Sequence, residues 1–272
     1  MRPFAKWPGR KTQLLETLKA RMPGTYGRYY EPFIGSGALL LDIQPERAVI
    51  NDINEPLLNV YNQLRTDADA VISAVNKLDA EPCDNGRYMA LRKIYNDKIK
   101  ADEFDIDCAA LMIWINKHCF NGLYRVNSKG MFNVAFNNKE NGVSIDEQNI
   151  RSIGLYLCDN DIEIRNLDFE QACSDVKAGD FIYFDPPYLP VSETANFTHY
   201  NKEGFSLDDQ KRLAALCRRL TEQGIKIMLS NNNVPLVYDL YKGFNIENID
   251  VRRSINRDAS KRTGKEVIIT NY

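Results

Sequence analysis

A glycine turn set between two apolar segments constrains the fold of this chain more than any other feature of the sequence. Residues 28–33 form a short aromatic segment typical of a strand, Gly35-Ser36-Gly37 breaks it, and residues 38–43 resume with helical spacing. A second apolar segment, residues 48–51, ends in Asp52. Strand, glycine turn, helix, strand and acid, in this order, open a doubly wound nucleotide-type fold. We therefore expect an α/β protein with a largely parallel sheet.

The alternating pattern pauses after this unit and then resumes, which indicates an insertion. Residues 56–155 are mostly helical and polar in pattern, with a glycine- and asparagine-rich loop at 119–142. Outside them, periodicity predicts helices at 12–22, 169–174, 207–222 and 234–241 and strands at 162–164, 181–184 and 225–229. Closing strands at 244–249 and 267–270 are expected to form an antiparallel edge. We divide the chain into a core domain, 1–55 with 156–272, and an inserted domain, 56–155.

Composition excludes several classes of protein. A chain of 272 residues with 44% hydrophobic residues, 26% charged residues and a net charge of −2 is globular rather than disordered. No apolar run approaches the ~18 to 20 residues that cross a bilayer. The N-terminal stretch lacks the apolar region of a signal peptide, and we expect a cytoplasmic protein. The six cysteines include no Cys-x-x-Cys pair, so neither a metal site nor a redox site is predicted.

Basic residues gather in three parts of this nearly neutral chain. They are dense in residues 1–28 and 252–265, and residues 117–139 contain no acid while basic and aromatic side chains alternate. Basic stretches interleaved with aromatics are typical of a surface that binds nucleic acid. Each stretch taken alone is equally compatible with an ordinary solvated surface.

The strongest chemical signal is Asp185-Pro186-Pro187-Tyr188. It follows the apolar strand predicted at 181–184, which places it at the carboxyl edge of the sheet, where open α/β folds bind ligands. Two successive prolines remove two backbone donors, so the loop presents carbonyl acceptors and a carboxylate. Such a loop suits an exocyclic amino group, and Tyr188 offers a stacking surface for a planar base. The alternative is a proline turn with a capping aspartate.

The glycine turn itself argues against a dinucleotide site. The dinucleotide fingerprint needs a third glycine three residues after Gly37, where this chain has Leu40. A nucleoside cofactor without phosphates has no such requirement. Asp52, at the end of the second strand, is placed to accept both ribose hydroxyls, although it can also serve as a helix cap.

Five motifs in this order resemble one enzyme family, the Dam/DpnII type (D12 class, alpha group) of adenine-N6 DNA methyltransferases. The motifs are Lys6-Trp7-Pro8-Gly9-Arg10-Lys11, Pro32-Phe33-x-Gly35-x-Gly37, Asp52, Asp168-Phe169 and Asp185-Pro186-Pro187-Tyr188. The resemblance implies a Rossmann-like, S-adenosylmethionine-dependent methyltransferase fold with a helical target-recognition insert. The two domains then become a catalytic cofactor-binding domain and an inserted DNA-binding domain.

The resemblance also assigns roles to residues. It implies that S-adenosylmethionine lies beside the glycine turn, with Asp52 on the ribose and Asp168 and Phe169 against the adenine ring. It also implies that the catalytic residues are Asp185, Pro186, Pro187 and Tyr188. The cofactor contacts it implies are Trp7, Lys11, Pro32, Phe33, Gly35, Gly37, Asp52, Asp168, Phe169 and Asp185.

Residues 121–134 are similar to the target-recognition hairpin of this family, and the resemblance makes GATC in duplex DNA the expected site. A target adenine must leave the stack to reach Tyr188, and Tyr124 or Phe120 would fill the gap. These aromatics can equally form a small core of the insert. The DNA contacts we predict are Lys117, Phe120, Asn121, Tyr124, Arg125, Asn127, Lys129 and Asn133.

Two other functions are considered. Amino-methylating enzymes of RNA or cytosine more often resemble Asn-Pro-Pro-Tyr or Ser-Pro-Pro-Tyr, and the acid at 185 argues against them. A DNA-binding protein that kept the fold without catalysis is disfavoured by the intact Asp185 motif and Asp52. No obligatory protein partner is indicated, while a cognate restriction endonuclease is compatible with the family.

Overall fold

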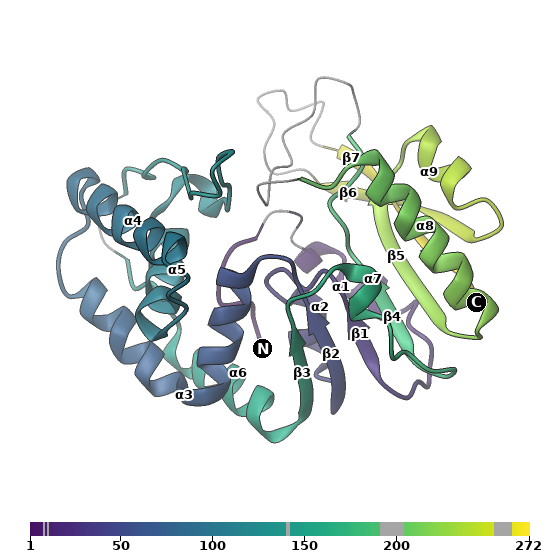
Figure 1. The fold of residues 1–272 in the computed structure, drawn as a ribbon, viewed down its shortest axis with the longest axis horizontal. Helices are drawn as coiled ribbons and strands as arrows, with labels where there is room; N and C mark the ends of the chain where they lie inside the picture. Colours follow the sequence, from purple (N-terminus) through teal and green to yellow (C-terminus); the bar gives the residue numbers. More distant parts are fainter. Residues whose placement is uncertain (8, 10, 140–141, 191–203, 253–262) are drawn as a thin grey trace.

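A computed structural model describes residues 1–7, 9, 11–139, 142–190, 204–252 and 263–272, and the fold is an α/β sandwich around a seven-stranded sheet (Figure 1). The strands lie in the order β3-β2-β1-β4-β5-β7-β6. Neighbours from β3 to β5 are parallel, whereas β7 is antiparallel to both β5 and β6. The strands are β1 (Tyr29–Glu31), β2 (Arg47–Asn51), β3 (Asp161–Arg165), β4 (Phe181–Phe184), β5 (Lys226–Asn232), β6 (Asn245–Arg252) and β7 (Thr263–Thr270).

The predicted doubly wound sheet with an antiparallel closing edge is therefore confirmed. Strand β4 is apolar or aromatic at every position and buried throughout, because helices cover both faces of the sheet. Strands β6 and β7 extend further than predicted, to Arg252 and from Thr263. Most of the added residues are polar and carry no apolar signal for a strand, but the antiparallel backbone ladder continues through them.

Alternate side chains of the strands feed two hydrophobic clusters. One face contributes Ile182 and Phe184, which pack with Leu213 of α8 (Leu207–Glu222) and Val237 of α9 (Pro235–Leu240). The opposite face contributes Phe181 and packs with α1 (Leu15–Lys19), α2 (Ala38–Ile43) and α6 (Glu147–Asp159). This period-2 division is what a sheet covered on both sides requires.

The insert is built on three long helices that lie beyond one edge of the sheet (Figure 1). They are α3 (Glu55–Asp79), α4 (Asn85–Lys100) and α5 (Ile106–His118), and α6 packs back against α3. Helix α5 buries almost every side chain, Trp114 among them. The core of the insert belongs to the same hydrophobic cluster as the α2 face of the sheet. The division into domains at 56–155 stays a prediction.

Side-chain caps fix where the long helices begin. Asn54, Asp84, Asp105 and Asp146 each accept a hydrogen bond from a backbone N–H in the first turn of the helix that follows. Ser206 forms a complete capping box at the start of α8. These caps explain why the predicted start of α8 agrees with the structure.

The helix predicted at 12–22 is shorter and begins differently. A 3-10 turn, η1 (Lys11–Gln13), precedes α1 and turns the side chain of Lys11 into the protein interior. The last short helices are η2 (Phe120–Gly122) and α7 (Phe169–Ala172). Within the described part of the chain, no helix has the length and apolar character needed to span a membrane.

Candidate active site

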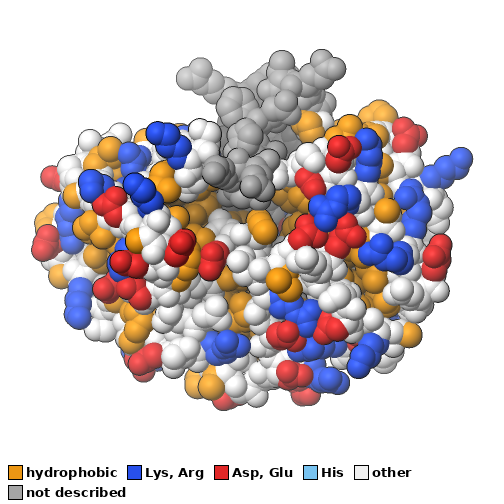
Figure 2. Space-filling model, in the orientation of Figure 1, with side chains coloured by type: hydrophobic (Ala, Val, Ile, Leu, Met, Phe, Trp, Pro, Cys, Tyr) orange, Lys and Arg blue, Asp and Glu red, His pale blue; other side chains and the backbone are white. Residues whose placement is uncertain are grey.

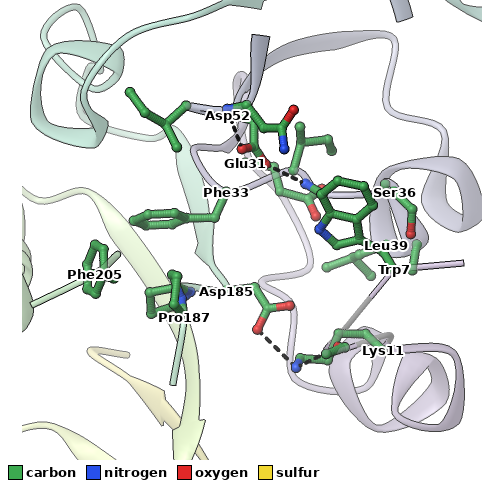
Figure 3. Close-up of a pocket in the computed structure, with 18 of the residues that line it drawn as sticks. Trp7, Lys11, Glu31, Phe33, Ser36, Leu39, Asp52, Asp185, Pro187 and Phe205 are labelled. Atoms are coloured by element: carbon green, nitrogen blue, oxygen red, sulfur yellow. Dashed lines mark hydrogen bonds and ion pairs between the residues drawn. The ribbon is translucent and has the colours of Figure 1, made fainter. Parts of the chain in front are cut away.

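The carboxyl ends of β1, β2 and β4 border a cavity of about 280 Å³ (Figure 3). Ten residues singled out from the sequence line it. They are Trp7, Lys11, Phe33, Gly35, Gly37, Asp52, Asp185, Pro186, Pro187 and Tyr188. Three segments far apart in the sequence thus meet at one edge of the sheet, as the strand pattern predicted.

The glycine turn after β1 forms one wall because only glycine fits it. Gly35 and Gly37 both have positive φ, +49° and +69°. A Cβ atom on Gly35 would stand 2.8 Å from Cδ1 of Trp7, and one on Gly37 would stand 2.5 Å from the hydroxyl of Tyr61. The Tyr61 hydroxyl also donates a hydrogen bond to the Gly35 carbonyl at 3.0 Å. Glycine therefore lets the turn pack closely on Trp7 and Tyr61 and line the cavity with backbone alone at these two positions.

Asp52 accepts hydrogen bonds through both carboxylate oxygens and so joins the glycine turn to the loop that leads into α3. Oδ2 accepts from the Gly35 N–H at 3.0 Å and Oδ1 from the Asn54 N–H at 2.9 Å. Burial raises the pKa of Asp52 to about 6, against the effect of these hydrogen bonds. Each oxygen keeps a second lone pair for a ligand. The next residue, Ile53, also lines the cavity and is 57% exposed, a candidate apolar contact that the sequence analysis missed.

Asn51 joins the loops that leave three strands, and sequence reasoning gave it no role. Its amide donates to the carbonyls of Pro32 and Leu167, both at 3.0 Å, and its Oδ1 accepts from the Leu167 N–H at 2.9 Å. Pro32 does not line the cavity and meets the site through this bond instead. The sequence signal that could have revealed this role is an asparagine at the end of an otherwise apolar strand.

Asp185 is the acidic centre of the opposite wall. The Lys11 ammonium lies 3.0 Å from Asp185 Oδ1 and 3.9 Å from Oε2 of Glu266. The same ammonium lies 4.4 Å from the centroid of the Tyr188 ring, whose hydroxyl donates to Glu266 Oε2 at 3.1 Å. Burial raises the pKa of Asp185 while Lys11 opposes the shift. Glu266 comes from β7 and was not predicted.

A buried amide pair fixes the loop that carries Asp185. Gln210 of α8 donates to the Pro187 carbonyl at 2.8 Å, and Asn231 of β5 accepts from the Leu189 N–H at 3.1 Å. The two amides also contact each other at 3.3 Å, and each is almost fully buried. The loop is thus held by rigid elements on both of its sides.

Glu31 adds a second buried carboxyl to the cavity wall. Only 3% of it is exposed, and the Tyr29 hydroxyl donates to its Oε2 at 2.7 Å. Burial raises its pKa to about 8, and the charge of Asp185 acts in the same direction. A cationic ligand in this cavity would favour the ionised form of Glu31.

Asp168 and Phe169 lie behind the cavity wall rather than on it. Asp168 caps α7 and pairs with Arg212 at 2.8 Å. The ring of Phe169 packs at a tilt against that of Phe33, with centroids 5.5 Å apart, and Phe33 together with Phe205 faces the cavity. Direct contact of Asp168 and Phe169 with a cofactor stays a prediction.

The N-terminal segment connects the cavity to the insert. Trp7 lies against Gly35 on one side and stacks on Tyr124 on the other, with ring centroids 4.9 Å apart. Asn116 of α5 exchanges two hydrogen bonds with the backbone of Lys6, at 2.8 and 2.9 Å. Pro8 and Arg10 of the N-terminal motif lie outside the described residues.

In the predicted recognition hairpin, the two candidate aromatics have opposite environments. Tyr124 is 4% exposed and its hydroxyl lies 3.3 Å from that of Tyr95, so it belongs to the core, the alternative that the sequence left open. Phe120 is 54% exposed. Its neighbour Asn121, which also has positive φ, is exposed as well.

The polar residues of this hairpin divide into structural and exposed ones. Asn127 accepts from the N–H groups of Lys129 and Met131 and so closes the turn. Arg125 donates to Asn133 at 2.8 Å across the hairpin. The side chains exposed without such a role in the turn are those of Lys117 and Lys129.

The basic stretch at 1–28 does not form one basic face. Arg2 pairs with Asp146, Lys19 with Asp42, Arg21 with Glu247 and Arg28 with Glu163. Figure 2 accordingly has basic and acidic side chains interspersed over the face in view. The stretch at 252–265 contains Arg253, Arg257, Lys261 and Arg262, which lie outside the described residues.

The sheet order, the glycine turn and the cavity at the carboxyl edge together define a Rossmann-like α/β fold with a ligand site at that edge. The model of the D12 class N6 adenine-specific DNA methyltransferases matches residues 7–255. This chain belongs to that family and is an adenine-specific DNA methyltransferase.

Named relatives cover the whole chain. It is 42% identical to a Type II methyltransferase of Lactococcus lactis subsp. cremoris, over 100% of this chain and 96% of the relative. It is 39% identical to a Type II methyltransferase of Methanocaldococcus jannaschii, over 100% of this chain and 99% of the relative. A DNA adenine methylase of Vibrio cholerae is 34% identical, over 100% of this chain and 96% of the relative.

Proposed function

We propose that this enzyme transfers a methyl group from S-adenosylmethionine to N6 of an adenine flipped out of duplex DNA, within GATC. The observation that carries the proposal is a single cavity with the glycine turn and Asp52 on one side and residues 185–188 on the other. A nucleoside cofactor and an amino group can therefore meet within one enclosed space. The resemblance of the motifs to the Dam/DpnII type supports GATC.

The residues around the cavity suit S-adenosylmethionine. The bare glycine turn leaves room for a ligand, and Asp52 is an acceptor at the strand end where ribose hydroxyls bind in such folds. Phe33 and Ile53 offer apolar surfaces to an adenine ring. The carboxyls of Glu31 and Asp185 favour a cation. When bound, the cofactor supplies the methyl group that is transferred.

The residues of the Asp185 loop activate the amino group of the target. The nitrogen lone pair of adenine is conjugated into its ring, so N6 is a poor nucleophile. Asp185 and the Pro186 carbonyl accept hydrogen bonds from the two N–H groups of N6 and hold this nitrogen in a pyramidal geometry. The carboxylate then stabilises the positive charge that develops on N6, in a site from which water is excluded. Direct transfer then needs alignment of the two bound reactants, and the proton that N6 loses after methylation passes to Asp185, whose pKa is raised by burial.

The DNA must deliver the target base into this site. A base within the duplex cannot reach Asp185, so the adenine flips out and stacks on Tyr188, at a cost of a few kcal/mol. Exposed Phe120 is the side chain that fills the gap. Lys117 and Lys129 contact phosphates. Names of two relatives, Type II methyltransferases, support a cognate restriction endonuclease as a functional partner.

Methyl transfer to defined duplexes tests this proposal. Purified protein is incubated with labelled S-adenosylmethionine and unmethylated duplexes that contain GATC or a permuted site, and the methylated nucleoside is identified by mass spectrometry. We expect N6-methyl-2′-deoxyadenosine in the GATC duplex alone. Equal label in both duplexes would reject GATC, and methylated cytosine would reject the assignment of the target atom.

An Asp185→Asn variant tests the mechanism in the same assay. We expect a loss of kcat on the order of 10²- to 10³-fold, as for removal of a group that stabilises transition-state charge. Binding of S-adenosylmethionine, measured by calorimetry, should persist. A loss of cofactor binding equal to the loss of kcat would assign Asp185 to the cofactor instead.

A further inference from the structure

Glu266 is a carboxylate in an unexpected position. It precedes Ile268 by two residues on β7, so its side chain is on the face where Ile268 joins the hydrophobic core. Its side chain is 18% exposed. A charge in such a place is costly unless it has partners of opposite charge or donors of hydrogen bonds.

The partners of Glu266 are residues of the active site. Oε2 accepts from the hydroxyl of Tyr188 at 3.1 Å and lies 3.9 Å from the Lys11 ammonium. The same ammonium lies 3.0 Å from Asp185. Lys11 is 4% exposed and also donates to the Gly9 carbonyl at 3.1 Å. One buried cation is therefore shared by two carboxylates.

This arrangement poses a problem for the proposed mechanism. Asp185 must accept an N–H of the target adenine, yet its Oδ1 faces Lys11. A buried ammonium that lost Asp185 without another anion nearby would be left unpaired, which is strongly unfavourable. The distances from Lys11 to the two carboxylates differ by only about 0.9 Å. A small rotation of the lysine side chain exchanges one partner for the other.

We propose that Glu266 is a positioning residue that receives the Lys11 ammonium when the amino group of the target adenine takes its place on Asp185. The inference rests on the proposed function and deepens it. Through the Tyr188 hydroxyl, Glu266 also holds the ring on which the flipped base stacks. A single carboxylate thus releases Asp185 from its ion pair with Lys11 and fixes the stacking surface.

A Glu266→Gln variant separates this role from a structural one. The amide keeps an acceptor for the Tyr188 hydroxyl but carries no charge to attract Lys11. We expect kcat to fall about tenfold or more while the affinity for S-adenosylmethionine changes less than twofold. Asp250→Asn is the matched control, because it neutralises an exposed carboxylate on the adjacent strand β6.

The pH profile provides a second readout. The negative charge of Glu266 raises the pKa of Asp185, so its removal lowers that pKa, and the acidic limb of kcat should move to lower pH. The other titratable or charged groups that act on Asp185 are unchanged in the variant, namely Lys11, Glu31, Tyr183 and Tyr188. An unmoved acidic limb would contradict the inference.

A cycle with Lys11→Met tests whether the two residues act together. If Glu266 works by receiving Lys11, Glu266→Gln should cost much less in the Lys11→Met background than in the wild type. Equal losses in both backgrounds would overturn the proposal. Tyr188→Phe removes only the hydrogen bond from the Tyr188 hydroxyl to Glu266. If it lowers kcat as much as Glu266→Gln does, Glu266 acts through Tyr188 alone and the proposal is wrong. Wild-type methylation of adenine in the same assay tests the proposed function independently.

Discussion

Asn51→Ala is expected to be among the more damaging single changes outside the reacting groups. The substitution removes three hydrogen bonds that join the loops after β1, β2 and β3. Asn51 is 1% exposed, so the Pro32 carbonyl and both backbone groups of Leu167 lose their partner in a place with little water. A net hydrogen bond contributes about 0.5 to 1.5 kcal/mol, and a buried group left unsatisfied costs more. The sum is roughly 2 to 4 kcal/mol.

Urea denaturation and thermal unfolding measure this loss. For a chain of this size, 1 kcal/mol shifts Tm by about 2 to 4 °C, so we expect a decrease of roughly 5 to 15 °C. Because the joined loops border the cavity, the stabilisation by S-adenosylmethionine should also weaken. Asn76→Ala is the control, since its amide bonds to Glu147 on the surface and should contribute less than about 0.5 kcal/mol.

Asn51→Asp sharpens the test. An aspartate can accept from the Leu167 N–H but has no donor for the two carbonyls, and its charge would be buried beside them. It should therefore be at least as destabilising as alanine. A loss of less than 1 kcal/mol for Asn51→Ala, or an aspartate variant as stable as the wild type, would refute this reasoning.

Three further predictions concern the cavity and the insert. Burial raises the pKa of Asp52 to about 6, so its contribution to stability is largest below 3.8 and is lost as pH rises through 6. The ribose contact proposed for Asp52 needs its ionised form. Titration calorimetry with S-adenosylmethionine should therefore give an affinity that falls about tenfold per pH unit below 6, a dependence that Asp52→Asn should abolish. Gly35→Ala should cost about 1 to 2 kcal/mol of stability from backbone strain and should also weaken cofactor binding by displacing Trp7. Gly86→Ala is the control, because Gly86 lies near a helix start and its added Cβ would be 3.4 Å from the nearest atom. This variant should be close to neutral in thermal unfolding. Phe120→Ala should reduce kcat/KM about tenfold on a paired duplex and much less when the target adenine is mismatched, because a mismatched base flips at lower cost; equal losses on both duplexes would exclude a wedge.

Those parts of the fold with a strong local signal could be predicted from the sequence. Strand β4 is a continuous apolar run, and residues 185–188 follow it directly, so both the strand and its place at the carboxyl edge were predictable. Helix α8 was predicted with its observed ends because amphipathic spacing and a capping box agree. The glycine turn and Asp52 likewise meet in the cavity as the strand order requires.

The residues that were missed act through contacts between distant segments. Glu266 meets Tyr188 and Lys11 only after β7 has inserted beside β5, which no local pattern shows. The burial of Tyr124 depends on Trp7, more than a hundred positions earlier in the sequence. The basic residues near the N-terminus look like one patch in the sequence, but four of them lie opposite acids from other elements, namely Arg2, Lys19, Arg21 and Arg28.

The single hydrophobic cluster shared by the insert and the sheet bears on how such enzymes acquire new target sites. A recognition module that is exchanged between relatives as a cassette must leave the interior of its host intact. Here α5 is joined to the N-terminal segment by Asn116 and Lys6, and the hairpin is joined by Tyr124 and Trp7. A chimaera that replaced residues 56–155 would have to import the first seven residues of the donor as well. If residues 121–134 read the DNA as proposed, changes in specificity are therefore more accessible through exposed positions of this hairpin than through exchange of the whole insert.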